Sequence, residues 1–349
     1  MYKIILLIVC KCVWHRFSIK LKRLKKAPNY NTNKYMKNKL LSLASLLAVF
    51  NANAIEIGPT GSGIEMSGFI DLYYQDTGTG TQTGDVGQVE FMFDYSAGPV
   101  SASVDFDFYA NTDGTGKDSA LEEAIVTYDF GNGMSVTGGK MLSYMGFEAY
   151  DPTNMYQFSY AYDAGGSAVQ NIYDAYDYGV SFDYGTDAYS IGLWSSLENS
   201  AGYEVALAYT GIENFTAKAI WSDFTDADEP YDKSTFWVSY QLDKLLLAAE
   251  VAQADSHTAG TADVDGFLIM GNYALTDKIG LTLRYSEEEI STAYNSATLA
   301  NEFSKITISP SYVFTDNLSG LIEYSTYEDD VAGNADPEDL LAVEVIYTF

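Results

Sequence analysis

The chain has 349 residues, of which 48 are acidic and 19 are basic, so its formal net charge at pH 7 is −29. The first 54 residues contain 11 of the bases and none of the acids, which leaves the remainder with 48 acids, 8 bases and a formal charge of −40. Nucleic-acid binding is excluded, because it needs clusters of Lys and Arg against the phosphates. An acidic chain instead attracts cations and repels anions at any opening that its fold provides. The same excess of acids is also expected of a protein adapted to saline surroundings, where acidic side chains keep the surface hydrated.

Catalytic and metal-binding side chains are scarce beyond residue 54. Both cysteines, Cys10 and Cys12, precede that point, and His257 is the one histidine that follows it. Disulfides, thiol catalysis and the usual zinc sites are therefore excluded there. A Ser-His-Asp triad would have to use His257, which lies in a loop-like stretch. We predict that the chain is not an enzyme and uses no metal or cofactor, with a hydrolase built on His257 as the alternative.

The N-terminal region has the layout of an export signal. A basic segment, 36–39, precedes an apolar run of eleven residues, 40–50, and then Ala52-Asn53-Ala54. This order predicts a secretory signal peptide over 36–54, because a membrane-spanning helix needs about 20 apolar residues. We interpret residues 1–35 as the product of a start codon assigned too far upstream, or as an unstructured extension. Residues 55–349 then form a single mature domain.

From residue 55 onward, apolar and polar residues alternate in sixteen segments. A period of two is typical of strands that have one apolar and one polar face. The chain is also rich in Tyr and Gly, with 29 of each, which fits a membrane β-barrel better than a soluble sandwich. The segments are 64–74, 88–97, 100–110, 120–130, 133–141, 172–184, 188–196, 203–210, 215–224, 234–242, 244–254, 264–275, 278–287, 303–314, 318–327 and 339–349.

Every second connection between these segments is tight, and the intervening ones are longer and more polar. The tight ones are Gly98-Pro99, Gly131-Asn132, Gly185-Thr186, Gly211-Ile212, Asp243, Thr276-Asp277 and Thr315-Asp316. This alternation predicts an all-β fold, a transmembrane antiparallel β-barrel of about 16 strands with short periplasmic turns and longer extracellular loops. Two weak segments, 133–141 and 203–210, leave 14 or 12 strands as alternatives.

In such a barrel, one face of each strand meets lipid and the other faces the interior. The apolar face must point outward, because a charge at the bilayer midplane costs about 2–4 kcal/mol. The polar face then lines an interior that about 16 strands make wide enough for water. By parity, the predicted lining residues include Asp71, Asp105, Asp107, Lys218, Glu250, Arg284, Lys305 and Glu323. Acids outnumber bases on this face, which favours cations.

The last strand carries a specific pattern. Val345, Tyr347 and Phe349 share one face with Leu341 and Val343, and the chain ends on Phe349. This strand resembles the closing strand of bacterial outer-membrane β-barrels. The resemblance implies that Val345, Tyr347 and Phe349 belong to the signal read by the barrel assembly machinery.

The whole mature region resembles the Gram-negative porins in its export signal, alternating segments and aromatic terminus. The stretch Gly139-Lys140…Gly146-Phe147-Glu148…Asn154…Ser159-Tyr160 is similar to that of the OmpL-like β-barrel porins. The resemblance implies a passive channel for small hydrophilic solutes in the cell outer membrane, in contact with lipid and lipopolysaccharide. The Pro-Glu-Phe-Gly-Gly type motif of enteric trimeric porins is absent, so a homotrimer stays open.

The longest connection, 142–171, follows the fifth segment. In diffusion porins the corresponding loop folds into the barrel and narrows the pore. The resemblance therefore implies that this loop supplies the pore constriction. The residues we assign to the constriction are Tyr144, Glu148, Tyr150, Asp151, Tyr156 and Asp163. The alternative is an ordinary external loop, or further strand residues around 156–162.

Two other loops, 223–232 and 328–339, are dense in acids and lack the spacing of an EF-hand. We interpret them as solvated loops, with a calcium site or divalent bridging to lipopolysaccharide as the alternative. For the function of the whole chain, the main alternative to a channel is a non-conducting surface protein, such as an adhesin or receptor, whose loops do the recognition.

Overall fold

A computed structural model describes residues 54–59, 61–78, 82–108, 120–148, 150–164, 172–173, 175–197, 201–225, 231–257, 262–294, 297–329 and 337–349. The chain divides into two units, Met1–Lys39 and Leu40–Phe349, and the described residues all belong to the second. The predicted extension and, apart from Ala54, the predicted signal peptide lie outside the described residues. Among those residues, none forms a helix long and apolar enough to cross a membrane.

The described residues form sixteen strands of one antiparallel sheet, preceded by a short strand, β1 (Ile55–Glu56), that pairs with the first of them. Each predicted segment corresponds to one strand, so the prediction of sixteen is confirmed and the alternatives of 14 and 12 are wrong. The strands are β2 (Ile64–Asp76), β3 (Gln82–Ala97), β4 (Val100–Asp107), β5 (Ala120–Asp129), β6 (Met134–Leu142), β7 (Tyr176–Gly185), β8 (Tyr189–Ser196), β9 (Ala201–Tyr209), β10 (Phe215–Thr225), β11 (Tyr231–Leu242), β12 (Leu245–Ser256), β13 (Ala262–Ala274), β14 (Ile279–Tyr294), β15 (Ala297–Thr315), β16 (Leu318–Asp329) and β17 (Leu340–Thr348).

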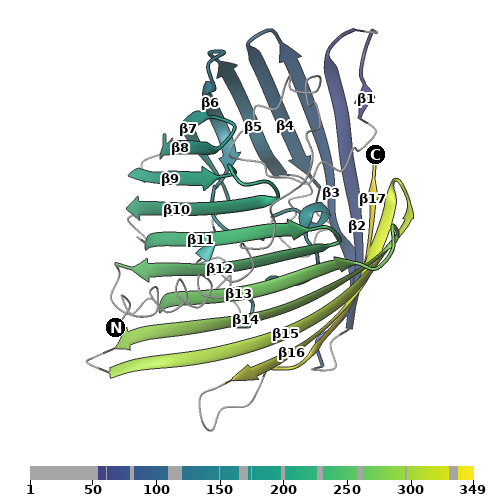
Figure 1. Ribbon diagram of the computed structural model, residues 1–349, viewed down its shortest axis with the longest axis vertical. Coiled ribbons are helices and arrows are strands. Elements are labelled where there is room, and N and C mark those ends of the chain that lie inside the picture. The colour runs from purple at the N-terminus through teal and green to yellow at the C-terminus, as the bar shows by residue number, and fades with distance from the viewer. Residues whose placement is uncertain are drawn as a thin grey trace, which may run out of the picture. The chain divides into compact units, whose positions relative to one another are not determined.

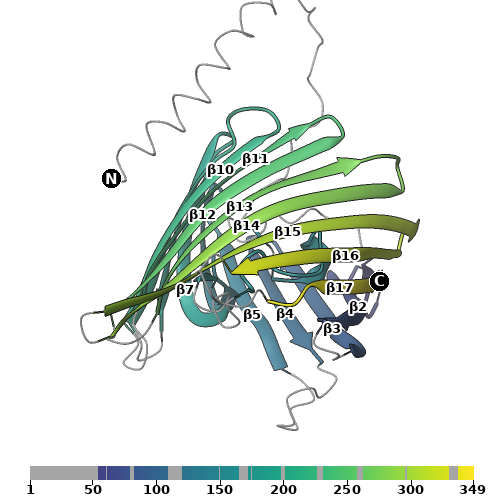
Figure 2. The ribbon, with the colours of Figure 1, turned by 90° about the horizontal axis from the view of Figure 1, so that it is seen from below.

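The sheet closes on itself as a barrel. Each strand pairs with the next along the chain, and β17 pairs with β2 from Leu341↔Asp76 to Thr348↔Phe69. Figures 1 and 2 show the strands following one another around the ring until β17, in yellow, lies beside β2, in purple. Closure gives each of the described strands β2 to β17 a paired neighbour on both sides, which is what hydrocarbon surroundings require.

All seven predicted tight turns join consecutive strands at one end of the barrel. Their residues fit the geometry, since Gly98 has φ of 61° and Asp243 has φ of 51°, in the left-handed region that Gly and Asp tolerate best. At the other end, one prediction of a long loop is wrong. Strands β14 and β15 stay paired as far as Tyr294↔Ala297, where we predicted that the strands stop at 287 and 303. Backbone pairing continues there after the apolar alternation has ended.

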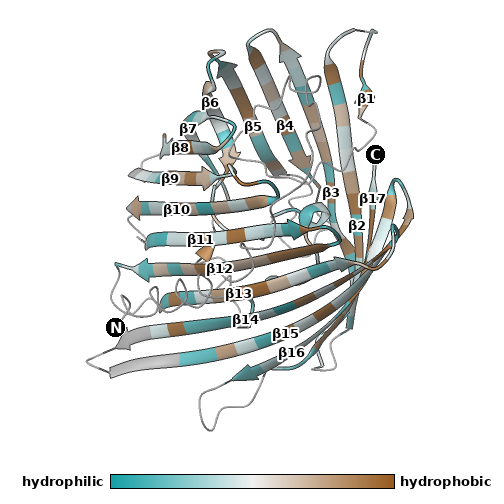
Figure 3. Cartoon of the chain, in the orientation of Figure 1, coloured by the Kyte–Doolittle hydropathy of each residue, from teal (hydrophilic) through white to brown (hydrophobic). Residues whose placement is uncertain are grey.

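The two faces of the strands differ as the alternation predicts. On β14, Leu283 is 52% exposed and its neighbour Arg284 is 2% exposed, because one points outward and the other into the barrel. The same contrast holds between Phe236, exposed, and Thr235, buried, on β11. Figure 3 shows the resulting alternation of hydrophobic and hydrophilic residues along the strands. Large apolar side chains are thus the exposed ones, which suits contact with lipid.

Candidate channel constriction

The described residues of the connection between β6 and β7 lie inside the barrel. Near its start, the backbone N–H of Tyr144 donates to Glu204 on β9 at 2.9 Å, and further on the N–H of Ser159 donates to Glu323 on β16 at 3.0 Å. Strands β9 and β16 are far apart around the ring, and the described segment follows the inside of the wall between them, with bonds to β11, β12, β14 and β15. We call residues 143–175 the inner loop. Its described residues include a short 3₁₀ turn, η2 (Pro152–Asn154), which begins at a proline as such turns often do.

Arg284 is one of three basic residues that hold the inner loop, with Lys305 and with Lys218, whose ammonium donates to the backbone oxygen of Tyr144 at 3.1 Å. Its guanidinium pairs with the carboxylate of Glu148 and also donates to the backbone oxygens of Ser159 at 2.7 Å and Tyr160 at 3.0 Å. The side chains of Arg284 and Glu148 are 0% and 1% exposed. A buried ion pair is stable only where hydrogen bonds also satisfy the partners, and here Glu148 accepts from Gln157 at 2.8 Å and from the N–H of Ala161 at 2.7 Å.

Lys305 is the second anchor. Its ammonium lies 2.8 Å from both carboxylate oxygens of Asp163 and donates to Ser159 Oγ at 2.6 Å and to the backbone oxygen of Tyr160 at 2.9 Å. Glu323 accepts hydrogen bonds from both the backbone N–H and the hydroxyl of Ser159. The same short piece of loop is therefore held by a base and an acid from neighbouring strands.

Aromatic residues complete the attachment to the wall. The hydroxyls of Tyr162 and Tyr173 donate to Glu250 on β12, and both rings pack in a buried apolar cluster with Val264 and Leu268. This corrects the prediction that strand residues begin at Ile172. Ile172 and Tyr173 are buried inner-loop residues, and β7 starts at Tyr176.

The tip of the inner loop reaches the opposite wall. There, oxygens of Glu90 on β3, Glu122 on β5 and Asp151 on the loop lie within 4.8 Å of one another. Gln88 donates to Glu90 at 3.2 Å and to Glu122 at 3.4 Å. Burial, with a smaller contribution from Asp107, raises the pKa of Asp151 to about 6. We call these three carboxylates the acidic cluster. Three such oxygens could hold a divalent cation, whereas the sequence predicted no metal site.

The predicted constriction residues thus divide into two groups. Tyr144, Glu148 and Asp163 are held against the wall, Tyr144 by a hydrogen bond from its hydroxyl to Asp183 at 2.9 Å. Tyr156 is tied to the same side through its backbone oxygen, which accepts from Thr282 at 2.9 Å. Asp151 lies beside β3 and β5, and Tyr150, which is 41% exposed, packs its ring against Tyr176 of β7 at 5.8 Å between centroids.

The predicted lining residues also lie in two places. Lys218, Glu250, Arg284, Lys305 and Glu323 meet the inner loop. Asp71, Asp105 and Asp107 are on β2 and β4, on the side of the acidic cluster, and Asp71 and Asp107 are buried. Their role in lining a pore remains a prediction.

Reasoning from the sequence missed several inward-facing acids, of which Glu122 and Glu204 contact the loop or its tip. Glu122 escaped because β5 has a bulge: Asp105 pairs with Glu123 and Phe106 with Leu121, so Glu122 is the extra residue and turns inward. Glu204 lies in a segment that we read as weak. Glu204 is two residues from Ala206 on β9 and therefore shares its inward face, and this spacing could have identified it.

The barrel matches solved outer-membrane porins in fold. OmpT of Vibrio cholerae in its trimer form has a TM-score of 0.62 and 15% identity, covering 82% of this chain and 99% of its own. OmpF of Salmonella typhi in complex with daunomycin has a TM-score of 0.66 and 14% identity, covering 84% and 100%. The anion-selective porin of Comamonas acidovorans has a TM-score of 0.62 and 11% identity, covering 82% and 99%. No protein-family model and no curated protein matches the chain.

These similarities establish the fold. At 11 to 15% identity they leave the solute and the charge preference to be argued from this chain's own residues. The anion-selective porin is an example. Its fold is similar to this barrel, and its selectivity is opposite to the cation preference that we predict from the sequence.

Proposed function

We propose that this protein is a passive diffusion channel of the outer membrane for small hydrophilic solutes. One observation carries the proposal: the inner loop is tied along the inside of the wall by bonds to β9, β14, β15 and β16. A 16-stranded ring is wide enough to hold water, and a loop fastened inside it sets the width of the remaining passage. No covalent chemistry and no cofactor enters this function.

The channel prefers cations. Lys218, Arg284 and Lys305 all donate hydrogen bonds to backbone oxygens of the inner loop, so their positive charge is committed to holding it. The opposite wall carries the acidic cluster together with Asp71, Asp105 and Asp107. Permeating ions therefore meet mainly carboxylates, and rings or rows of carboxylates favour cations.

The proposal also covers the location, oligomeric state, export and assembly of the channel. Porins in the outer membrane share this fold, and a trimer form exists for one of them, which supports a homotrimer here. Export through a signal peptide over 36–54, recognition of Val345, Tyr347 and Phe349 by the assembly machinery, and contact with lipopolysaccharide are parts of the proposal. So is the likeness to the OmpL-like porins, which rests on the residues quoted from the sequence alone.

The test is single-channel conductance of the purified protein in planar bilayers, with the reversal potential measured across a KCl gradient. We expect discrete open channels and a reversal potential of the sign given by cation preference. A barrel that is folded by its heat-modifiable gel mobility and yet never conducts would overturn the channel. A reversal potential of the other sign would overturn the cation preference alone.

A further inference from the structure

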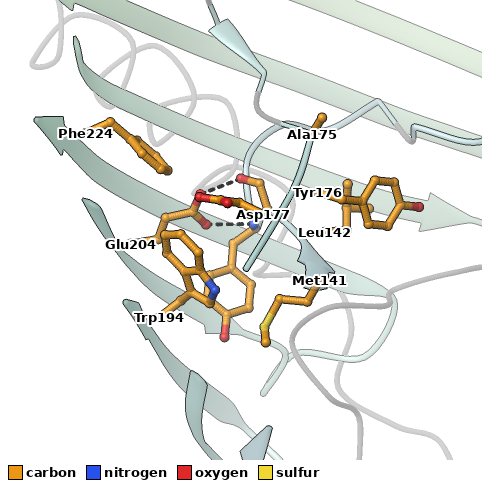
Figure 4. A pocket seen from close by; sticks show the side chains of 10 residues that line it. Met141, Leu142, Ala175, Tyr176, Asp177, Trp194, Glu204 and Phe224 are labelled. Carbon is orange, nitrogen blue, oxygen red and sulfur yellow. Dashed lines mark hydrogen bonds between the residues drawn. The ribbon is translucent and has the colours of Figure 1, made fainter. Parts of the chain in front are cut away.

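Strands β5 and β6 are paired over only part of their length. Their register ends at Ala124↔Lys140, although β5 begins at Ala120 and β6 continues to Leu142. Beyond Lys140, β6 is paired on its other side, with Leu142 opposite Tyr176 of β7. Figure 4 shows Leu142 and Tyr176 together at the ends of these two strands. In the described sheet, the residues of β5 that precede Ala124 therefore have no strand partner on the β6 side.

The same end of β5 is irregular on its other side as well. Against β4, Asp105 pairs with Glu123 and Phe106 with Leu121, so Glu122 is a bulged residue. The bulge decides which way Glu122 points. A regular register would place it opposite Phe106, which is one of the exposed, outward residues. With the bulge, Glu122 is 7% exposed and belongs to the acidic cluster.

Lys140 supplies a contact where the strand pairing is missing. Its ammonium donates to the backbone oxygen of Leu121, the residue before the bulge, at 2.6 Å. It also lies 6.0 Å from the centre of the Tyr176 ring, and its charge acts on the carboxylate of Glu122. A backbone carbonyl without a hydrogen bond is costly beside lipid, and a bond from a charged donor is stronger than one from a neutral donor. Lys140 therefore stabilises the backbone next to the bulge.

The place of Lys140 on its strand separates it from the passage. The inward residues of β6 include Thr137, whose hydroxyl bonds that of Thr127, and the buried Met141. Alternation puts Lys140 on the outward face, between the two strands. A lysine on this face is unfavourable unless its ammonium reaches polar groups, and the oxygen of Leu121 is such a group. Any effect of Lys140 on permeating ions must then act largely through the residue that it holds.

We infer that Lys140 is a positioning residue for the charge preference of the channel: its bond to Leu121 keeps the bulge of β5 in place, and the bulge keeps Glu122 in the acidic cluster. The inference rests on the proposed function and adds a residue outside the passage that determines its specificity. A role through charge alone predicts the opposite result. Loss of a positive charge near Glu122 would make the passage more attractive to cations, whereas loss of the bulge makes it less attractive.

The test is the reversal potential across a KCl gradient, measured in planar bilayers for the full-length wild type, Lys140→Met, Glu122→Gln and the double variant. Met has no donor, and the outward face accepts an apolar residue. We expect the cation-to-anion permeability ratio of K140M to fall at least about twofold, to near that of E122Q, with no further fall in the double variant. Lys140→Arg, which keeps both the charge and the donors, should retain the wild-type ratio.

Lys278→Met is the matched control. The ammonium of Lys278 also donates to a backbone oxygen, that of Phe314 at 3.5 Å, but beside a tight turn at the other end of the barrel. This variant should have the wild-type ratio. Heat-modifiable gel mobility verifies that each variant folds, and Lys140→Gln replaces K140M if that variant does not.

The outcomes separate this inference from the proposed function. A ratio that rises or stays constant in K140M would overturn the inference and leave the channel standing. So would a further fall in the double variant, because the two residues would then act independently. A folded wild type that never conducts would overturn the proposed function and this inference together.

Discussion

Gly68 and Phe349 close the barrel with a reciprocal pair of backbone hydrogen bonds: each N–H donates to the other's carbonyl oxygen, both at 3.0 Å. The ring of Phe349 lies where a side chain on residue 68 would be, 2.7 Å from an ideal Cβ position. The last residue of the chain is thus seated over a glycine of the first barrel strand, and it also packs against Phe91 on β3 at 5.4 Å between ring centroids.

The first prediction concerns this seam. Gly68→Val should lower the yield of folded barrel, because the new side chain meets both the Phe349 ring and the backbone oxygen of Glu90. The readout is the fraction that shows heat-modifiable mobility after refolding. Gly271→Val is the matched control, since the nearest atom to a Cβ there is a flexible Leu247 side-chain end at 3.5 Å. Equal yields from both variants would contradict the role of Gly68.

The second prediction concerns the Arg284 anchor. Arg284→Met should lower stability by about 3–5 kcal/mol, because it leaves the carboxylate of Glu148 buried without its partner. Denaturant unfolding measures the change. The double variant R284M/E148Q should recover much of the loss, since no unpaired charge remains. If the double variant is as unstable as R284M, the buried charge is not the cause.

The third prediction concerns the effect of the Arg284 anchor on conductance. With Arg284 replaced by Met, the inner loop loses four hydrogen bonds to β14 that hold Glu148, Ser159 and Tyr160. Single-channel records should then show a larger and noisier conductance than the wild type, because the loop no longer holds one position. A conductance identical to the wild type in size and noise would show that the loop does not set the passage.

The fourth prediction is a pH dependence. Because burial raises the pKa of Asp151 to about 6, this carboxyl is ionised at pH 7 and protonates as the pH falls through 6. The contribution of Asp151 to cation preference should therefore be full above pH 7 and decline between pH 7 and 5. Asp151→Asn should be less selective at pH 7 and should have a smaller step in this window. A raised pKa also means that the ionised form opposes folding, so this group makes the barrel more stable, not less, as the pH falls. A reversal potential that is flat from pH 7 to 5 in the wild type would contradict the assignment.

The strand arrangement was predictable because lipid imposes a rule on every strand. Apolar residues such as Leu283 must face outward and polar ones such as Arg284 inward, so the period of two appears in the sequence itself. The tight turns at Gly98 and Asp243 follow from local chemistry. Contacts between the inner loop and the wall were not predictable, because they join residues such as Ser159 and Glu323 that are 164 positions apart.

Bulges set a second limit on prediction from sequence. One extra residue in β5 turns Glu122 inward, and another in β3, at Gly87, shifts the pairing beside Asp71. Nothing in the alternation marks either position, and a single such residue changes the face of those that follow. Trp237 is an apolar residue on the otherwise polar, inward face of β11. The structure explains it, because its ring packs against Phe147 of the inner loop at 5.6 Å between ring centroids.

The long pairing of β14 with β15 makes the rim of the barrel uneven. Strand β14 has 16 residues, which at about 3.4 Å each extend about 54 Å, whereas crossing hydrocarbon takes about 9–11 residues. At a tilt near 45° this strand rises about 38 Å, beyond an apolar band about 25 Å tall. In an outer membrane, this side of the barrel wall therefore rises above the lipid, with β13 still paired to β14 as far as Ala262↔Thr292. An antibody or a phage would meet this raised wall before it reached the channel entrance.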